Sequence, residues 1–79
     1  MEKNEIAGKL TIVFRTVFDN TTLVLTNELS AKDVEGWNSL THMMLISEIE
    51  DVFAIKFKLK DLNKMKNVGD MIEIIRSKL

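Results

Sequence analysis

Ser39 and His42 are the two side chains whose types and spacing suggest covalent chemistry. They lie three residues apart, on neighbouring turns of one helix face if the segment is helical, and a serine beside a histidine is the arrangement of an activated nucleophile. No acidic residue that could orient His42 lies nearby in the sequence, and a domain of 79 residues leaves little room for a substrate pocket. We therefore do not predict a hydrolase, and we interpret His42 as a partly buried polar residue near a helix start.

The segment that must position Ser39 reads as a helix that begins at Asn38 or Ser39 and ends near Phe53. Asn and Ser are both favoured N-cap residues, so a plain cap is the structural alternative for Ser39. At 100° per residue, one arc of this helix collects the residues expected to face the core, which are Leu45, Ile46, Ile49, Val52 and Phe53. The opposite arc holds Leu40 and Met44, with Met43 at its edge, and exposed apolar residues there predict a docking surface.

Two further helices are predicted from the same period of 3.6 residues. The first has Asn4 as its candidate cap, with a helix that already includes Glu2 or Lys3 as the alternative, and it stops at residues 19–22. Its apolar stripe consists of Ile6, Leu10, Val13, Phe14 and Val17. The last is capped by Asn67, with Asp70 close to a capping-box position. Its apolar stripe consists of Val68, Met71, Ile72, Ile75 and Leu79.

Two connecting segments complete the predicted fold. Residues 19–38 are expected to form a long loop with residues 23–25 tucked onto the core, and long ordered loops are often functional. Residues 54–60 alternate like a strand, but a lone strand has no ladder to join. We favour an extended linker there, anchored by Phe57, and then a short helix over about 61–65. The prediction is one all-α domain over residues 1–79, a small bundle of three to four helices with a long first loop.

The composition excludes several classes of protein. The chain has no cysteine and a single histidine, so we expect neither a disulfide framework nor a metal site. The longest apolar run is four residues, far below the roughly 20 that span a bilayer. The amino terminus lacks the apolar core of a signal peptide. We therefore expect a cytoplasmic protein with no membrane partner.

The charges are distributed unevenly, which concerns partners rather than fold. Residues 19–55 carry seven acidic residues against Lys32 alone, whereas residues 56–66 carry five lysines against Asp61 alone. The lysines could contact nucleic acid, but Phe57 is the only aromatic residue among them and the whole chain is near neutral. We predict a solvated basic edge and no nucleic-acid partner, with a helical DNA-binding domain as the rejected alternative.

The stretch from Gly36 to Met43, with Asn38-Ser39-Leu40 at its centre, resembles the prosthetic-group site of acyl carrier proteins, where Asp-Ser-Leu opens the second helix. The likeness continues through the acidic residues before Phe53, through Phe57 and through the last helix. It spans nearly the whole chain and is weakest in residues 19–35. The short motif is unspecific by itself, whereas the motif, helix order and length together are fairly specific.

This resemblance implies a carrier rather than an enzyme. It implies that a phosphopantetheinyl transferase attaches 4'-phosphopantetheine from coenzyme A to Ser39, where the arm holds acyl groups as thioesters. The phosphodiester would lie at the positive end of the helix dipole, beside free N–H groups, and our minor hypothesis is that His42 hydrogen-bonds it. The implied partners are acyl-loading and acyl-transfer enzymes of fatty-acid, polyketide-like or other specialised biosynthesis, which a monomeric carrier would visit. The implied docking residues are Leu40, Met43, Met44, Glu48, Glu50 and Asp51.

Three departures from the family pattern leave alternatives open. Asn38 replaces the usual aspartate, which in the family is thought to aid the transferase, so an unmodified interaction domain of the same fold stays possible. Thr41 and Met44 stand where many fatty-acid carriers have acids, which favours a dedicated carrier of a specialised pathway. Trp37 is similarly placed in stand-alone carriers of polyketide-like, peptide or cell-envelope pathways, so a peptidyl or aminoacyl carrier is a further alternative.

Overall fold

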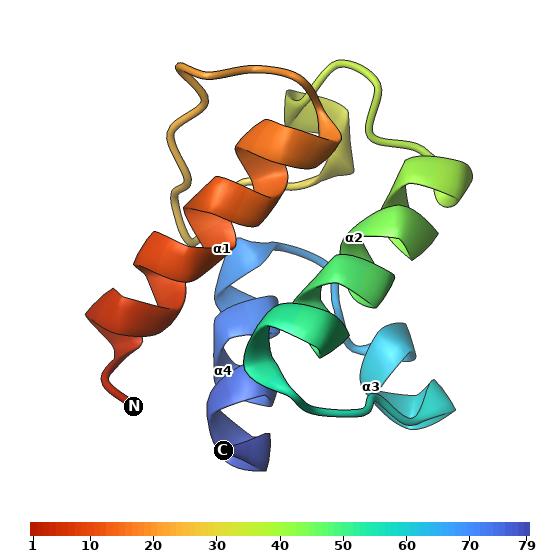
Figure 1. Ribbon diagram of the computed structural model, residues 1–79. Coiled ribbons are helices and arrows are strands. Elements are labelled where there is room, and N and C mark those ends of the chain that lie inside the picture. The colour runs from red at the N-terminus through yellow and green to blue at the C-terminus, as the bar shows by residue number, and fades with distance from the viewer.

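The chain folds into helices joined by loops, and the computed structural model describes all 79 residues (Figure 1). In chain order the elements are α1 (Lys3–Val17), the 3-10 helix η1 (Ala31–Asp33), α2 (Ser39–Phe53), α3 (Leu59–Asn63) and α4 (Val68–Lys78). The predicted all-α fold, with three main helices, a short fourth and a long first loop, is therefore confirmed. None of the helices is long and apolar enough to cross a bilayer.

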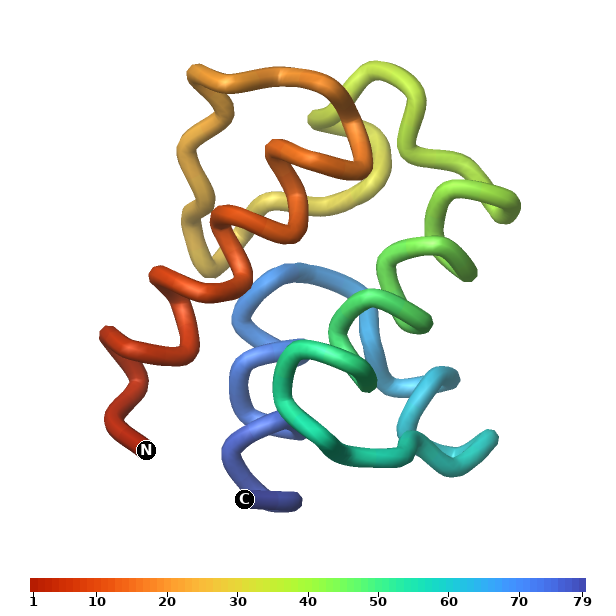
Figure 2. Tube along the Cα trace, viewed as in Figure 1, coloured from red at the N-terminus to blue at the C-terminus, as the bar shows by residue number.

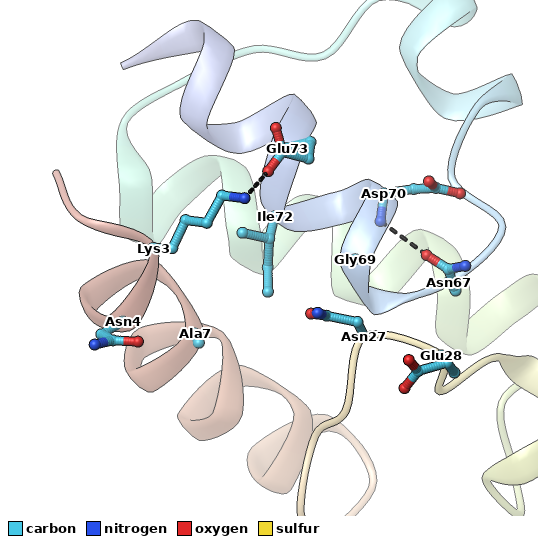
Figure 3. A pocket seen from close by; sticks show the side chains of 10 residues that line it. All are labelled: Lys3, Asn4, Ala7, Asn27, Glu28, Asn67, Gly69, Asp70, Ile72 and Glu73. Carbon is cyan, nitrogen blue, oxygen red and sulfur yellow. Dashed lines mark hydrogen bonds and ion pairs between the residues drawn. The ribbon is translucent and has the colours of Figure 1, made fainter.

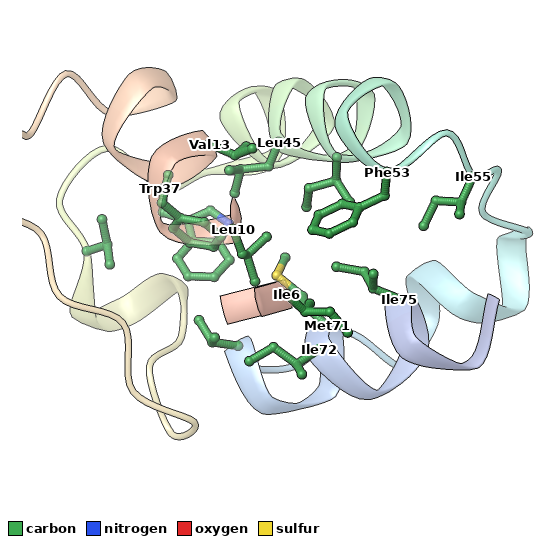
Figure 4. Close-up of a cluster of buried hydrophobic side chains, with 14 residues drawn as sticks. Ile6, Leu10, Val13, Trp37, Leu45, Phe53, Ile55, Met71, Ile72 and Ile75 are labelled. Atoms are coloured by element: carbon green, nitrogen blue, oxygen red, sulfur yellow. The ribbon is translucent and has the colours of Figure 1, made fainter. Parts of the chain in front are cut away.

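The three long helices surround one apolar core (Figure 4). α1 contributes Ile6, Leu10, Val13 and Phe14; α2 contributes Leu45, Ile49 and Phe53; α4 contributes Val68, Met71, Ile72 and Ile75. No polar or charged side chain is buried. The apolar stripes of the sequence thus meet in the interior, and removal of their surface from water drives the packing of the helices.

Three predictions at the edges of helices were wrong. Asn4 lies inside α1, whose N-cap is Glu2, an extended residue that makes no side-chain cap bond. Val52 is 44% exposed, because at 100° per residue it falls about 20° outside the arc of the buried α2 residues. Leu79 is 47% exposed because it lies beyond the last turn of α4, as its C-cap.

The long loop after α1 runs back along the bundle and is fixed to the start of α4 (Figure 2). The N–H groups of Val68 and Gly69 donate to the carbonyl oxygens of Leu29 and Asn27, each over 2.9 Å. As predicted, Leu23 and Leu25 pack against the core, but Val24 does not, since it is 69% exposed. The loop is therefore an ordered part of the fold, tied down by backbone hydrogen bonds.

The connection between α2 and α4 is extended and contains α3, which begins two residues earlier than predicted. Phe57 packs against the core, as expected, and its N–H donates to Glu50 Oε2 over 2.8 Å. Asp61 Oδ2 accepts from the Lys58 N–H over 2.8 Å and pairs with Lys78 Nζ at 2.8 Å. These bonds hold the pKa of Asp61 below its ordinary value, with the Lys78 hydrogen bond as the main cause.

The start of α4 is capped by Asn67, as predicted, because its Oδ1 accepts from the Asp70 N–H over 2.8 Å. The reciprocal bond of a capping box does not form. The Asp70 carboxylate instead accepts from the N–H of Lys66, over 3.1 Å. Asp70 therefore fixes the chain that leads into α4 rather than completing the cap.

Candidate functional site at the start of α2

Ser39 is the first residue of α2, and its side chain is exposed. Its hydroxyl makes no hydrogen bond within the chain, unlike the hydroxyls of Thr11, Thr16, Thr41 and Ser77, which donate to backbone carbonyls. A hydroxyl that stabilises nothing in the fold is free to be esterified without loss of structure. The interpretation of Ser39 as a plain helix cap is wrong, because Asn38 is the N-cap.

Asn38 and Thr41 build the helix start that presents Ser39. Asn38 Oδ1 accepts from the N–H groups of Leu40 and Thr41, both over 3.0 Å, and Thr41 Oγ1 accepts from the Asn38 N–H over 2.8 Å. This is a capping box in which threonine takes the place of the usual acidic partner. Thr41 Oγ1 also donates to the carbonyl oxygen of Gly36, whose φ of 86° suits glycine. In the first turn of α2, only the Ser39 N–H is left without an acceptor, because Asn38 accepts from those of Leu40 and Thr41.

Trp37 and His42 support this turn from the inside. The Trp37 indole Nε1–H donates to His42 Nδ1 over 3.0 Å, and the two ring planes are nearly parallel, with an interplanar angle of 14°. Trp37 in turn meets Phe14 edge-on, with ring centroids 5.2 Å apart. The structure thus confirms that His42 is a half-buried polar residue near the helix start. Partial burial lowers the pKa of His42 from its ordinary value of 6.5. Because Nδ1 accepts from the Trp37 indole, the neutral imidazole carries its proton on Nε2.

A shallow pocket of about 520 Å³ opens between η1 and the start of α2, and Ser39 is part of its wall. The lining residues are Ala31, Trp37, Asn38, Ser39, His42 and Met43. None of them carries a charge at neutral pH. The volume lies within the range of small-molecule sites.

A second pocket, of about 510 Å³, lies between the start of α1, the long loop and the start of α4 (Figure 3). Its lining includes Lys3, Glu28, Asp70 and Glu73, and Lys3 pairs with Glu73 at 2.6 Å. No group of three side chains in the molecule is arranged to hold a metal ion. The second pocket contains no residue that the sequence singles out for covalent chemistry.

The outer face of α2 carries the residues predicted for docking. Leu40 is 72% exposed, Met43 56% and Met44 47%. Glu48 and Asp51 are exposed on the same helix. Glu50 is half-buried and its carboxylate binds the linker at Phe57, so this acid also has a structural task.

Sequence reasoning placed Trp37 in the stretch that resembles the prosthetic-group site but assigned it no contact there. Its position was informative, because Trp37 directly precedes the N-cap and His42 is the fourth residue of the helix. These are the two positions of a hydrophobic staple, whose side chains pack across a helix start. Here the staple pairs an indole with an imidazole and adds a hydrogen bond.

Comparison with known proteins covers most of the chain. An acyl carrier protein from Exiguobacterium sp. is 38% identical over 55 residues, which cover 70% of this chain and 70% of that protein. The solution NMR structure of the holo acyl carrier protein from Geobacter metallireducens superposes with a TM-score of 0.87 and 47% identity, covering 91% of this chain and 83% of that one. No protein-family model matches the sequence.

Proposed function

Because the chain belongs to the acyl carrier protein family, a family of carriers rather than enzymes, we propose that it holds acyl groups as thioesters on a 4'-phosphopantetheine arm attached to Ser39. The observation that carries the proposal is the exposed Ser39 hydroxyl, which has no partner in the fold and stands at the first position of α2. The related structure from Geobacter metallireducens is a holo protein, which supports a prosthetic group here.

The surroundings of Ser39 fit a phosphodiester. The amino end of a helix carries a partial positive charge, and the Ser39 N–H has no acceptor in the chain. The sequence led us to expect several free N–H groups at this helix start. Those of Leu40 and Thr41 are not free, because they donate to Asn38 Oδ1. The pocket wall beside Ser39 holds no carboxylate that would repel a phosphate.

The division of labour between arm and chain follows from this geometry. The arm, once attached, supplies the thiol that binds the acyl group. The capped first turn of α2 fixes the point of attachment, because Asn38, Thr41 and Gly36 hold its backbone in place. Tethering to a rigid point turns transfer between partner enzymes into a local encounter at high effective concentration.

The exposed face of α2 is proposed as the surface that docks partner enzymes, including the transferase that attaches the arm. Leu40, Met43 and Met44 supply apolar anchors beside Ser39. The exposed carboxylates of Glu48 and Asp51, together with the half-buried carboxylate of Glu50, favour basic patches on the partners. Leu40→Ala is expected to slow acyl transfer at least tenfold at subsaturating carrier while leaving the fold intact.

We propose that the chain serves a specialised pathway. We also propose that it acts as a monomer in the cytoplasm. Thr41 and Met44 replace acids of many fatty-acid carriers, and the structure gives Thr41 a capping task that needs its hydroxyl. The acidic surface of α2 is correspondingly thinner. Enzymes that recognise this chain are therefore expected to rely more on the apolar contacts and less on charge, which a weak salt dependence of transfer would reveal.

The proposal is tested by expressing the chain with a phosphopantetheinyl transferase of broad specificity and recording its intact mass. The expected result is a gain of one phosphopantetheine that disappears in Ser39→Ala. Ser47→Ala is the matched control, since Ser47 is also exposed on α2 but lies two turns from its start. No gain with any of several transferases would contradict the proposal and favour an unmodified interaction domain.

A further inference from the structure

The linker after α2 and the helix α3 form a second charged surface, separate from the outer face of α2. We infer that this surface, the basic edge of residues 56–66, binds an anionic lipid membrane from one side, with its lysines against the lipid phosphates and Leu59 in the outer part of the apolar layer. The sequence alone favoured a solvated edge and no membrane partner. The structure adds two observations that favour a bound surface, and neither depends on the arm at Ser39.

The first observation is that the charges of the basic edge are free to meet a partner. Its five lysines are all exposed and none forms an ion pair. They are Lys56, Lys58, Lys60, Lys64 and Lys66. The only acidic residue of the segment, Asp61, is paired with Lys78 of α4 at 2.8 Å. The half-buried carboxylates of Glu50 and Asp70 bind backbone N–H groups of the segment, those of Phe57 and Lys66, and no lysine side chain.

The second observation is an exposed leucine among these lysines. Leu59 begins α3 between Lys58 and Lys60, and at 76% it is the most exposed large apolar side chain of the molecule. At a bilayer surface the leucine leaves water while the ammonium groups beside it stay with the headgroups. A nucleic-acid backbone attracts the same lysines but offers Leu59 no apolar layer. Interfaces between proteins favour arginine over lysine, and the basic edge has no arginine.

The position of the basic edge leaves Ser39 free. Ser39 is the first of the 15 residues of α2, a helix about 22 Å long. The linker leaves the other end of this helix, and α3 lies beside that end (Figure 1). A chain held by its basic edge therefore keeps Ser39 in solution. A few lysines and one leucine give a weak attachment that salt reverses, so the chain can also leave the membrane.

The inference is tested by co-sedimentation of the unmodified protein with vesicles. One set contains phosphatidylglycerol and phosphatidylcholine, and the other contains phosphatidylcholine alone. We expect binding to the anionic vesicles that weakens about tenfold or more as sodium chloride rises from about 0.05 M to about 0.5 M, and none to the neutral vesicles. No binding to anionic vesicles at low salt, or equal binding to both sets, would overturn the inference. Binding to a DNA duplex at the same salt, with none to vesicles, would also overturn it.

Matched variants separate the basic edge from the rest of the chain. Lys60→Glu is expected to lower the partition coefficient about tenfold or more, whereas Lys32→Glu, at an exposed lysine of η1, should change it little. Leu59→Gln should lower it about threefold or more, and Ile12→Gln, at a 67% exposed residue of α1, should not. Circular dichroism confirms that each variant is folded. Equal losses within either pair would contradict the inference. Attachment of the arm enters none of these results, so their failure leaves the proposed carrier function standing.

Discussion

The starts of α2 and α4 are capped by the same residue type and differ in what lies against them. Asn38 Oδ1 accepts from the N–H groups of Leu40 and Thr41, and Asn67 Oδ1 accepts from that of Asp70. At α4 the next two N–H groups bind the carbonyl oxygens of Leu29 and Asn27, and Val68 is buried. At α2 the next residue is Ser39, exposed and without a partner. The neighbouring loop, rather than the cap, therefore decides whether a helix start is closed, as at α4, or open, as at α2.

The open start of α2 is predicted to depend on its buried support far more than on its exposed residues. Trp37→Ala removes a side chain that packs on Phe14 and Phe18 and binds His42, and should lower the free energy of unfolding by about 3–5 kcal/mol. Leu40→Ala, on the exposed side, should change it by less than about 0.5 kcal/mol. Urea denaturation followed by circular dichroism measures both. Similar losses of stability in the two variants would contradict the view that Trp37 supports the start of α2 while Leu40 contributes little to the fold.

The closed start of α4 is predicted to resist any side chain at Gly69. A Cβ there would lie 3.2 Å from the carbonyl oxygen of Asn27, whereas a Cβ at Gly8 in α1 would meet nothing within 4 Å. Gly8→Ala should stabilise by about 0.5–1 kcal/mol through helix propensity. The stability of Gly69→Ala should be about 1–2 kcal/mol lower than that of Gly8→Ala, because the gain in helix propensity is offset by crowding of the added Cβ against the loop. Equal stabilisation in thermal unfolding would show that the loop is not held closely.

The two caps are predicted to differ in their contribution to stability. Asn67→Ala should cost about 1–2 kcal/mol, because the residue is half-buried where the long loop is fixed. Asn38→Ala should lower the free energy of unfolding by about 0.5–1 kcal/mol. Asn38 is exposed, so water can bind the N–H groups that the substitution leaves without an acceptor. Amide hydrogen exchange adds a local test: Val68 and Gly69 should lose protection only in Asn67→Ala. A larger loss of stability in Asn38→Ala would reverse the comparison.

The smallest predicted effect is a pH dependence confined to the open start. Burial lowers the pKa of His42, so the unfolded chain binds more protons than the folded chain just below pH 6.5. His42 therefore contributes stability that is complete above pH 6.5 and is lost as the pH falls toward the lower folded-state pKa. Denaturation midpoints from pH 8 to 5 should show a fall that His42→Asn removes. Asp61, whose pKa is also lowered, acts only in the more acidic range below its ordinary value of 3.8.

The sequence was sufficient to predict the helices, because apolar periodicity and capping residues are local signals, whereas Ser39 was singled out by the resemblance to acyl carrier proteins. The structure was needed for features that depend on distant contacts. The bond from Trp37 to His42 combines with packing on Phe14, far away in the chain. The tie between the long loop and α4 involves backbone atoms, which no side-chain pattern encodes. Val52 was misplaced because periodicity gives the direction of a side chain but not the width of the partner surface.

The most direct test of the central claim is to locate the modification within the chain. Trypsin cleaves after Lys32 and Lys56 and releases residues 33–56 as one peptide, which contains Ser39 and Ser47. Fragmentation of this peptide from protein treated with coenzyme A and a phosphopantetheinyl transferase should place the added mass on Ser39 alone. Added mass on Ser47 or on another peptide, or an unmodified peptide after exhaustive treatment, would contradict the account.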